Sequence, residues 1–427
     1  MAMVDSPRAG PAEAVGRPAS LSERANLVMQ VAEVLQANGE STDDTLSAAQ
    51  RLGRGLGLSV SVIPDWSDLH LQADEADVRF ASFRATSPTN INMLRVSSAL
   101  LTLEKATAGV LAPPAATDAM RAISEAPAAP TWLFTVAAVM GAVALAVING
   151  VEHGSAVLLI ALSAGLGAML RRAVARYSTN TLLQPFSAAF VAGIIGALAL
   201  RFNLSSSLML VALCPCLVLV PGPHFLNGAM DLLAARISLG ASRLLFALMI
   251  MLAISAGVLL GLALLGQSLT VDPPGRTVPL WFDMIAAGVA VAAYSVYYST
   301  PARMWPWPVV IGTLAHGFRF VTITALGADV AMGAFVACLL VGVVLTPVAR
   351  RHHLPFAAVG FAAVVSMIPG SYVIRMASGL VLLSHGISLD VLSGTLSDAI
   401  IAIVTIVAMS AGLIVPKLVL SRFQMIA

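Results

Sequence analysis

Two short segments of the sequence combine a Pro-Gly pair with side chains that can bind polar ligands. In the first, Pro221 and Gly222 end a long apolar run. His224, Asn227 and Asp231 follow at i, i+3 and i+7, which places them on one face of a helix. An imidazole, an amide and a carboxylate on one face can hold a polar solute and exchange protons. We therefore expect this segment to contact substrate.

The second segment repeats the pattern. Pro369 and Gly370 end another apolar run and are followed by Ser371 and Arg375. Proline removes a backbone donor, and glycine permits positive φ, so a helix broken at such a pair leaves free N–H and C=O groups. At membrane depth these groups are tolerated only where they line a cavity. They suit the carboxylate and ammonium of an amino acid, so we expect both segments to form the substrate site.

Further candidates for proton coupling are acidic residues within or near apolar runs. Asp283 and Asp398 belong to this group, because a charge inside the bilayer is costly and is kept for a function. Both lie near the ends of their runs, so an interfacial position is the alternative. Asp231 and His224 complete the set. For Asp231 the alternative is a loop helix in which it is solvated or paired with Arg236.

Composition indicates that most of the chain contacts lipid. Of 427 residues, 58% are hydrophobic and only 11% are charged, whereas soluble domains carry about 25% charged residues. The net charge of +2 gives no reason to expect a nucleic-acid partner. The three cysteines lie in apolar runs, which argues against a disulfide framework and a metal site. We expect neither a metal nor a cofactor.

Apolar runs of membrane-spanning length recur after residue 130. A hydrocarbon core about 30 Å thick requires about 20 helical residues. The sequence predicts ten spans: 131–149, 155–170, 183–200, 205–220, 243–266, 278–298, 306–320, 328–348, 355–369 and 396–416.

The part before residue 130 has a different character. Its charges are common, and its periodicity predicts helices at 22–37, 42–55 and 90–107 with three strands between the last two. Ser41 is a suitable N-cap for the second helix. The chain then divides into a disordered lead, an α+β domain, a linker and two membrane repeats: 1–20, 21–112, 113–130, 131–270 and 271–427. Residues 1–20 contain no apolar signal segment, so the α+β domain is expected in the cytoplasm.

A constant offset relates the two membrane segments. Pro221 and Pro369 are 148 residues apart, and the same shift superposes span 131–149 on 279–297 and Arg171 on Arg319. Each half contains five predicted spans. Because five is odd, two similar halves must lie in the membrane in opposite orientations, which is a recurrent plan of secondary transporters. The fold class predicted is therefore a polytopic α-helical membrane protein with two inverted five-helix repeats.

The distribution of basic residues predicts the orientation. With the α+β domain in the cytoplasm, ten Lys and Arg fall on the inner side and four on the outer side. The outer four are Arg201, Arg276, Arg319 and Arg375. The positive-inside rule then favours an inner-membrane protein with both termini in the cytoplasm.

Several motifs resemble the threonine/serine exporter family. They are ANGESTDDT (37–45), LGRGLGLSVSVIPDWSDL, INMLRVSSALLTLEKATAG (91–109) and LVPGPHFLNGAMDLLAARISLGASRL. The resemblance covers nearly the whole chain after about residue 22, including the order of a soluble domain, five spans and five more. It implies export of threonine and serine driven by the proton gradient, with no enzymatic activity.

Other functions stay open at this point. Two-subunit relatives are linked to dicarboxylate export, so a succinate-like cargo is the alternative. A channel or a membrane-anchored enzyme is less favoured, because the sequence contains no Walker-type phosphate loop and no nucleophile elbow. The expected partners are a small-molecule substrate, protons and lipid, and a homo-oligomer is left open.

Overall fold

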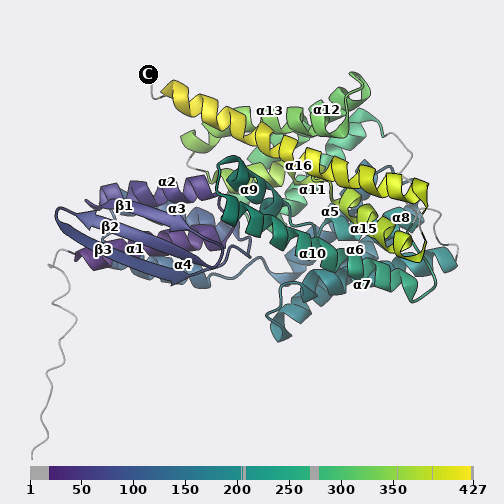
Figure 1. Ribbon diagram of the computed structural model, residues 1–427, viewed down its shortest axis with the longest axis horizontal. Coiled ribbons are helices and arrows are strands. Elements are labelled where there is room, and N and C mark those ends of the chain that lie inside the picture. The colour runs from purple at the N-terminus through teal and green to yellow at the C-terminus, as the bar shows by residue number, and fades with distance from the viewer. Residues whose placement is uncertain are drawn as a thin grey trace, which may run out of the picture.

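The chain folds into a small front unit that contains a β-sheet and a larger part built of helices (Figure 1). The computed structural model describes residues 19–202, 204, 208–269, 278–352, 354–386 and 388–424. The predicted lead, residues 1–20, lies almost wholly outside the described residues. The front unit comprises residues 19–125, and the larger part, here called the helical part, comprises residues 131–424.

The front unit packs helices against a three-stranded antiparallel sheet of order β1-β2-β3. Strand β2 alternates as expected for a half-buried strand: Leu69 and Leu71 are buried, whereas His70 and Gln72 are exposed. The hydroxyl of Ser41 accepts a bond from the Asp44 amide, which confirms the predicted N-cap. The elements are α1 (Leu21–Ala37), α2 (Thr42–Gly55), β1 (Ser59–Pro64), β2 (Asp68–Glu75), β3 (Val78–Ala85), α3 (Met93–Thr107) and α4 (Pro113–Glu125).

Helix α4 occupies most of the segment predicted as a linker, 113–130. Prolines at its first two positions are compatible with a helix start, because the first N–H groups of a helix have no partner. Ala116 and Met120 of α4 are buried, and the helix packs on α1 and α3. The connection between the two parts is therefore shorter than predicted and is limited to residues 126–130.

The helical part contains seven described helices that are long and apolar enough to cross a membrane, namely α5, α6, α7, α10, α11, α13 and α16. Two bent pairs, α8 with α9 and α14 with α15, raise the number to nine if each pair is one span. The prediction of ten spans exceeds this number because α12, at 306–320, does not qualify; its sequence includes His316 and Arg319.

The bounds of these helices follow in chain order. They are α5 (Thr131–Ile148), α6 (Gly154–Tyr177), α7 (Leu183–Arg201), α8 (Leu208–Leu217), α9 (Gly222–Leu233), α10 (Ile237–Ala263), α11 (Leu280–Tyr297), η1 (Ala302–Met304), α12 (Pro306–Thr324), α13 (Val330–Arg351), α14 (Phe356–Val364), η2 (Val365–Met367), α15 (Gly370–His385) and α16 (Leu389–Gln424).

Helices before and after residue 270 begin at matching positions. Shifted by 148, the start of α5 falls at 279, one residue before α11, and the start of α9 falls at 370, where α15 begins. The pairs α6/α12, α7/α13, α8/α14 and α10/α16 agree within four residues. Packing follows the same pairing, since α7 packs on α10 as α13 packs on α16, and α5 packs on α11.

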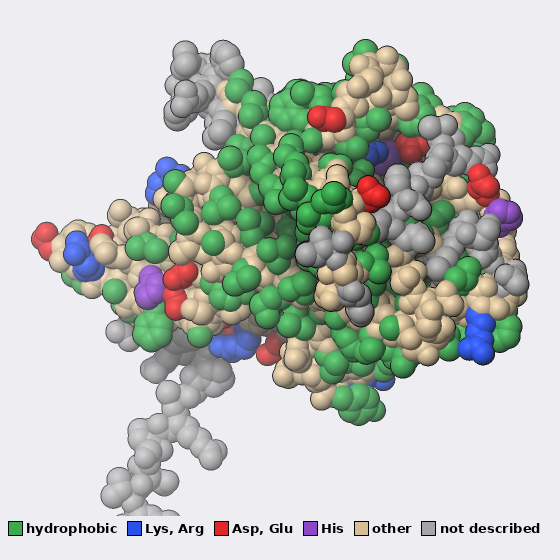
Figure 2. Space-filling model, turned by 45° about the vertical axis from the view of Figure 1, so that its right-hand side comes forward, with side chains coloured by type: hydrophobic (Ala, Val, Ile, Leu, Met, Phe, Trp, Pro, Cys, Tyr) green, Lys and Arg blue, Asp and Glu red, His purple; other side chains and the backbone are tan. Residues whose placement is uncertain are grey.

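Surface chemistry differs between the two parts. Figure 2 shows charged side chains on the projecting front unit, whereas hydrophobic side chains cover much of the visible face of the helical part. Exposed Leu, Val and Ile side chains occur on the long helices, for example Leu158 at 73%, Leu252 at 60% and Ile403 at 64% exposure. Such a surface is stable in contact with lipid rather than water.

Candidate functional site

The two Pro-Gly segments adopt the same backbone turn. Pro221 has φ −80° and ψ 60°, and Pro369 has φ −76° and ψ 46°. The Gly222 amide donates to the Val220 carbonyl over 2.8 Å, and the Gly370 amide donates to the Ile368 carbonyl over 2.7 Å. These are inverse γ-turns. They bend the chain by 62° between α8 and α9 and by 51° between α14 and α15.

The two turns pack against each other reciprocally. A Cβ atom added to Gly222 would lie 2.2 Å from Cδ1 of Ile368, and one added to Gly370 would lie 2.5 Å from Cγ2 of Val220. Each glycine thus contacts the residue two positions before the other glycine, and Val220 and Ile368 are themselves related by 148 residues. A Cβ at either position would force the facing side chain to move. We call this contact the crossing.

Two cavities flank the crossing, and Val220 lines both of them. The front cavity, about 270 Å³, is covered by residues 89–91 of the front unit. The far cavity, about 200 Å³, includes Asn149 at the end of α5 distant from the front unit. Polar and aromatic lining residues of the front cavity are Thr89, Asn90, Phe134, Arg171, Arg172, Thr181, Gln184, His224, Phe246, Tyr297 and Tyr298. Those of the far cavity are Asn149, Tyr294, Arg319, Ser366, Ser371, Tyr372 and Arg375.

Residues at the 148-residue offset occupy equivalent places in the two cavities. Arg171 of α6 lines the front cavity, and Arg319 of α12 lines the far cavity. The same holds for Pro223 with Ser371 and for His224 with Tyr372. The two cavities are thus built from matching positions of the two halves.

Each of these arginines carries a nitrogen that has no partner. Nη1 of Arg171 and Nε of Arg319 are buried without a hydrogen bond. Within the described part of the chain, no carboxylate forms an ion pair with either guanidinium. Arg171 lies instead over the ring of Tyr297, 5.1 Å from its centroid. A buried guanidinium with an unpartnered nitrogen and no direct ion pair is costly. Both cavities are therefore suited to bind the carboxylate of a solute.

The predicted polar stripe of α9 is buried but divides between different surroundings. His224 lines the front cavity. Its ring packs edge-on against the ring of Phe246, and the two ring centroids are 5.1 Å apart. Nδ2 of Asn227 donates to the Gly39 carbonyl of the front unit over 3.2 Å. Asn227 therefore contacts the front unit rather than either cavity.

Asp231 has 2% exposure and pairs with two arginines. Its carboxylate lies 3.3 Å from Arg236 and 3.3 Å from Arg243 of α10. Asp231 therefore does pair with Arg236, as the alternative stated. Its burial excludes the other alternative, in which its side chain is solvated. Asp231 links α9 to α10 and does not line the front or the far cavity.

The second set of predicted residues gathers at the far cavity. Pro369, Ser371 and Arg375 all line it. Arg375 pairs with Asp398 of α16, with Nε 3.1 Å from Oδ2, and its guanidinium lies over the Tyr372 ring. Pro221 lines the front cavity, whereas Gly222 and Gly370 form the crossing itself.

Asp283 forms a separate buried pair. Its carboxylate lies 2.6 Å from Nδ1 of His316, which joins α11 to α12. Exposure of Asp283 is 5%, and Asp398 at 2% is likewise buried, so neither side chain is solvated. Arg319, one turn after His316, lies close enough to Asp283 to interact with its charge.

Sequence reasoning did not assign Arg171 and Arg319 to the site. It placed both in loops and used them only to support the repeat and the orientation. The signal that identifies them was present, because within residues 131–427 they are the one pair of arginines related by the offset of 148 that joins the two Pro-Gly turns.

Comparison with known families covers both halves of the chain. The family model described as "Putative threonine/serine exporter" matches residues 26–265, which is more than half of the chain. A second model, "Threonine/Serine exporter, ThrE", matches residues 283–419. The chain belongs to the threonine/serine exporter family. No solved structure matches it.

Family membership agrees with the apolar helices. The chain is a multi-pass membrane protein of a transporter family, and the two family models meet near residue 270, where the two sets of helices also divide. The crossing and both cavities therefore lie where the two matched regions contact each other.

Proposed function

We propose that the protein is a secondary transporter that exports threonine and serine across the inner membrane in exchange for protons. The observation that carries this proposal is the crossing, where two identical turns from the two halves separate two cavities. Access can alternate if one turn moves relative to the other, which closes one cavity as the other opens. The crossing then serves as the barrier between the two sides.

Alternating access further requires that the halves are inverted repeats. Support comes from the shared offset of the helix starts, the identical turns and the reciprocal glycine contacts. Inverted halves allow inward and outward states to be exchanged conformations of one fold. The front unit then lies in the cytoplasm, as the excess of basic residues on that side favours, and both termini are on the same side.

The arginines favour an amino acid over a dicarboxylate as cargo in the far cavity. Arg319 is available for one carboxylate, whereas Arg375 is already paired with Asp398. A second carboxylate of a succinate-like solute would have no unpaired cation there. The hydroxyl groups of Ser366 and Ser371 also line this cavity and match a cargo that carries a hydroxyl.

Proton exchange requires a carboxylate that binds either a proton or the cargo ammonium. Asp283 is the acid best placed for this, because it interacts with Arg319 and is hydrogen-bonded to His316. Nε2 of His316 is buried without a partner and can accept a proton. Competition between a proton and an ammonium for one site produces exchange rather than co-transport.

Efflux from proteoliposomes tests the proposal. Vesicles loaded with radiolabelled threonine, serine or succinate, and given a higher proton concentration outside than inside, are compared with and without an uncoupler. We expect uncoupler-sensitive efflux of threonine and serine, lowered about tenfold or more in Arg319→Gln, because a bond to a charged group contributes about 1.5–3 kcal/mol. The matched control is Arg201→Gln, which alters an exposed arginine. Efflux of succinate alone would refute the cargo assignment, and efflux insensitive to the uncoupler would refute proton exchange.

A further inference from the structure

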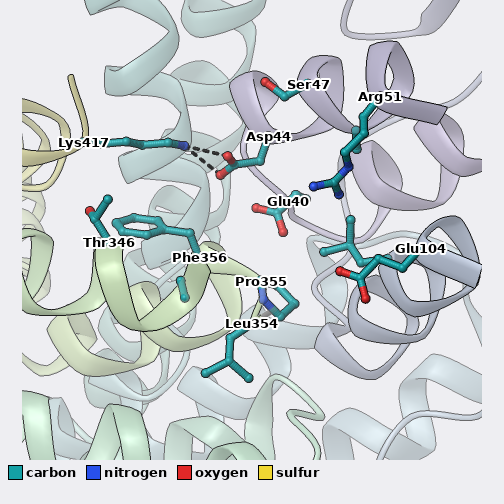
Figure 3. A pocket seen from close by; sticks show the side chains of 13 residues that line it. Glu40, Asp44, Ser47, Arg51, Glu104, Thr346, Leu354, Pro355, Phe356 and Lys417 are labelled. Atoms are coloured by element: carbon teal, nitrogen blue, oxygen red, sulfur yellow. Dashed lines mark hydrogen bonds and ion pairs between the residues drawn. The ribbon is translucent and has the colours of Figure 1, made fainter. Parts of the chain in front are cut away.

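A third cavity, the interface cavity, lies between the front unit and the helical part. Its volume is about 430 Å³, the largest of the three cavities discussed here. Helices α2 and α3 form one wall, and α13, α14 and α16 form the other. Figure 3 shows side chains of both walls pointing into the same space. The lining residues used below are Glu40, Asp44, Ser47, Arg51, Glu104, Phe356 and Lys417.

Glu40 presents an unsatisfied carboxylate to this cavity. The residue has 0% exposure, and its Oε1 accepts a bond from the Ser41 amide over 2.8 Å. Its Oε2 is buried and has no hydrogen-bond partner. In Figure 3 the carboxyl group points into the cavity. A buried carboxylate oxygen without a donor is costly, so without a ligand Glu40 holds a proton at neutral pH, although the Ala357 amide lies near its carboxyl group. An ammonium group that takes the place of this proton would supply the missing donor to the ionised carboxylate.

The nearby lysine is already committed. Nζ of Lys417 lies 2.8 Å from each carboxylate oxygen of Asp44. Glu104 of α3 also lines the cavity and has an interaction partner of its own. Glu40 is then the acid that an incoming ammonium group would meet. An ammonium has three donors and can reach a carboxylate oxygen from a small ligand without disturbing the pair.

A cationic group stands on the same wall as Glu40. Arg51 of α2 is exposed, lines the cavity and forms no ion pair with any residue that the structure describes. Ser47 lies one turn before it on the same helix face. A guanidinium binds a carboxylate through two parallel bonds. The wall of α2 thus offers a hydroxyl and a carboxylate-binding group near the unsatisfied acid.

Charge and shape exclude two other ligand classes. A dicarboxylate would place a second negative charge near Glu40 and Asp44. A bare metal ion would need several oxygen ligands, but Asp44 is neutralised by Lys417, and the described residues contain no group of three or more potential metal ligands. The apolar face of Phe356 and neighbouring side chains suits a short aliphatic group.

We propose that the interface cavity is a binding site for a free small amino acid, with the ammonium at Glu40 and the carboxylate at Arg51. The site is separate from the two cavities at the crossing. It does not depend on the proposed function, because a zwitterion can bind here whether or not it is transported. Since the two walls belong to different parts of the molecule, an occupied site strengthens the contact of the front unit with the helical part.

Binding to the purified full-length protein in detergent tests this proposal. Radiolabelled L-threonine is measured by equilibrium binding, with L-lactate, ethanolamine and succinate as competitors. We expect threonine affinity to fall about tenfold or more in Arg51→Gln and in Glu40→Gln, because each loses a charge-assisted bond. Arg54→Gln, which changes an exposed arginine on the same helix, is expected to bind as the wild type does. Lactate and ethanolamine, which each lack one of the two charges, are expected to compete poorly.

Two further arms separate this site from the transport site. Arg319→Gln is expected to retain the component of binding that Arg51→Gln removes. Arg51 is on the surface, so its substitution should fold normally even if Glu40→Gln does not, and elution profiles on size exclusion check both. Threonine binding unchanged in Arg51→Gln, or stronger competition by succinate than by serine, would overturn the proposal. If the wild-type protein binds threonine through Arg51 but shows no threonine efflux, the result counts against the transport assignment alone.

Discussion

The front cavity and the far cavity flank one crossing, but they differ in what covers them and in their polar side chains. Both have an arginine at matching positions, 171 and 319, and each adjoins an inverse γ-turn of its own half. His224 faces the front cavity where Tyr372 faces the far cavity. The elements common to both cavities are the turn and the cation. We infer that these perform the shared tasks of closing the path and binding a carboxylate.

The ion pairs behind the two turns show a second difference. In the first half the acid, Asp231, is on α9 and the base, Arg243, is on α10. In the second half the base, Arg375, is on α15 and the acid, Asp398, is on α16. Equivalent helices are therefore connected by charges of reversed order. In each half an ion pair joins the helix after the Pro-Gly turn to the next helix, α9 to α10 and α15 to α16. Which of the two helices carries the acid differs between the halves.

Removing one partner of these pairs should have the largest effect. Asp398→Asn leaves Arg375 buried without a counter-charge, which is expected to cost about 3–5 kcal/mol of stability. Asp231→Asn should cost a similar amount, because Arg243 has 2% exposure and no other described partner. Thermal unfolding monitored by size exclusion in detergent measures both. The exchange Arg375→Asp with Asp398→Arg reproduces the order of the first half and should recover a large part of the loss. Failure to recover would show that the order of charges is fixed by local geometry.

Substitutions at the crossing should have the next largest effect. Gly222→Ala and Gly370→Ala each force a Cβ into the opposite turn, and overpacking of this kind costs about 1–3 kcal/mol. We expect efflux to fall strongly and equally in the two variants. Ile368→Ala should partly restore Gly222→Ala, because it removes the atom that the new Cβ meets. Gly154→Ala, where nothing lies within 4 Å, is the control. A large loss of efflux in only one of the two glycine variants would show that the two turns are not functionally equivalent.

The contact of the front unit should depend on pH through Glu40. Burial, followed by the nearby charge of Asp44, raises the pKa of Glu40 from 4.5 to about 8. Lys417 opposes this rise, and Arg51 and Glu104 also face the cavity. The raised pKa means that the contribution to stability is complete below about pH 4.5 and is lost as pH rises through about 8.

Hydrogen exchange of α2 measures this dependence. After correction for intrinsic exchange, we expect opening of α2 to increase about tenfold or more between pH 5 and pH 8, since one pH unit of linkage is a factor of ten. Glu40→Gln should remove most of the increase. If the opening of α2 increases as steeply with pH in Glu40→Gln, the pH dependence arises from a titratable group other than Glu40.

Ion pairs between the front unit and the helical part should have the smallest effect. Asp43 pairs with Arg236, which precedes α10, and Asp44 pairs with Lys417 of α16, so the start of α2 is joined to both halves. Partly exposed pairs contribute about 0–1 kcal/mol. Asp43→Asn should therefore lower the unfolding midpoint slightly, and Asp44→Asn somewhat more because its pair is less exposed. Both losses should shrink at high salt. Asp118→Asn, in an exposed pair within α4, is the control.

Local sequence patterns predicted most of the elements. Apolar runs predicted seven helices of spanning length and both broken segments, and alternation predicted the three strands. The α4 helix was assigned to a linker, because an Ala- and Pro-rich stretch has weak periodicity and its buried face depends on contact with α1 and α3. The ten predicted spans became seven to nine, because α12 is less apolar than a spanning helix requires.

Residues that lie at the crossing and the cavities were predicted where the signal was local and missed where it was not. Pro221, Gly222, Pro369 and Gly370 were found because a Pro-Gly pair in an apolar run is a local anomaly. The position of Arg319 in the far cavity was missed, because a single arginine near a span end is common. Its buried, unpartnered nitrogen is visible only when all neighbouring helices are in place.

The sequence by itself determined that the chain crosses a membrane, that its two halves share one offset and that each half is broken once. It determined these because composition, periodicity and backbone constraints of proline and glycine act within a few residues. The tertiary structure alone decided that the turns cross, that Asp231 meets Arg243, that Arg375 meets Asp398, and that Glu40 is enclosed beside a cavity. These contacts join residues far apart in the chain, and burial, which sets their energy, exists only after the helices have packed.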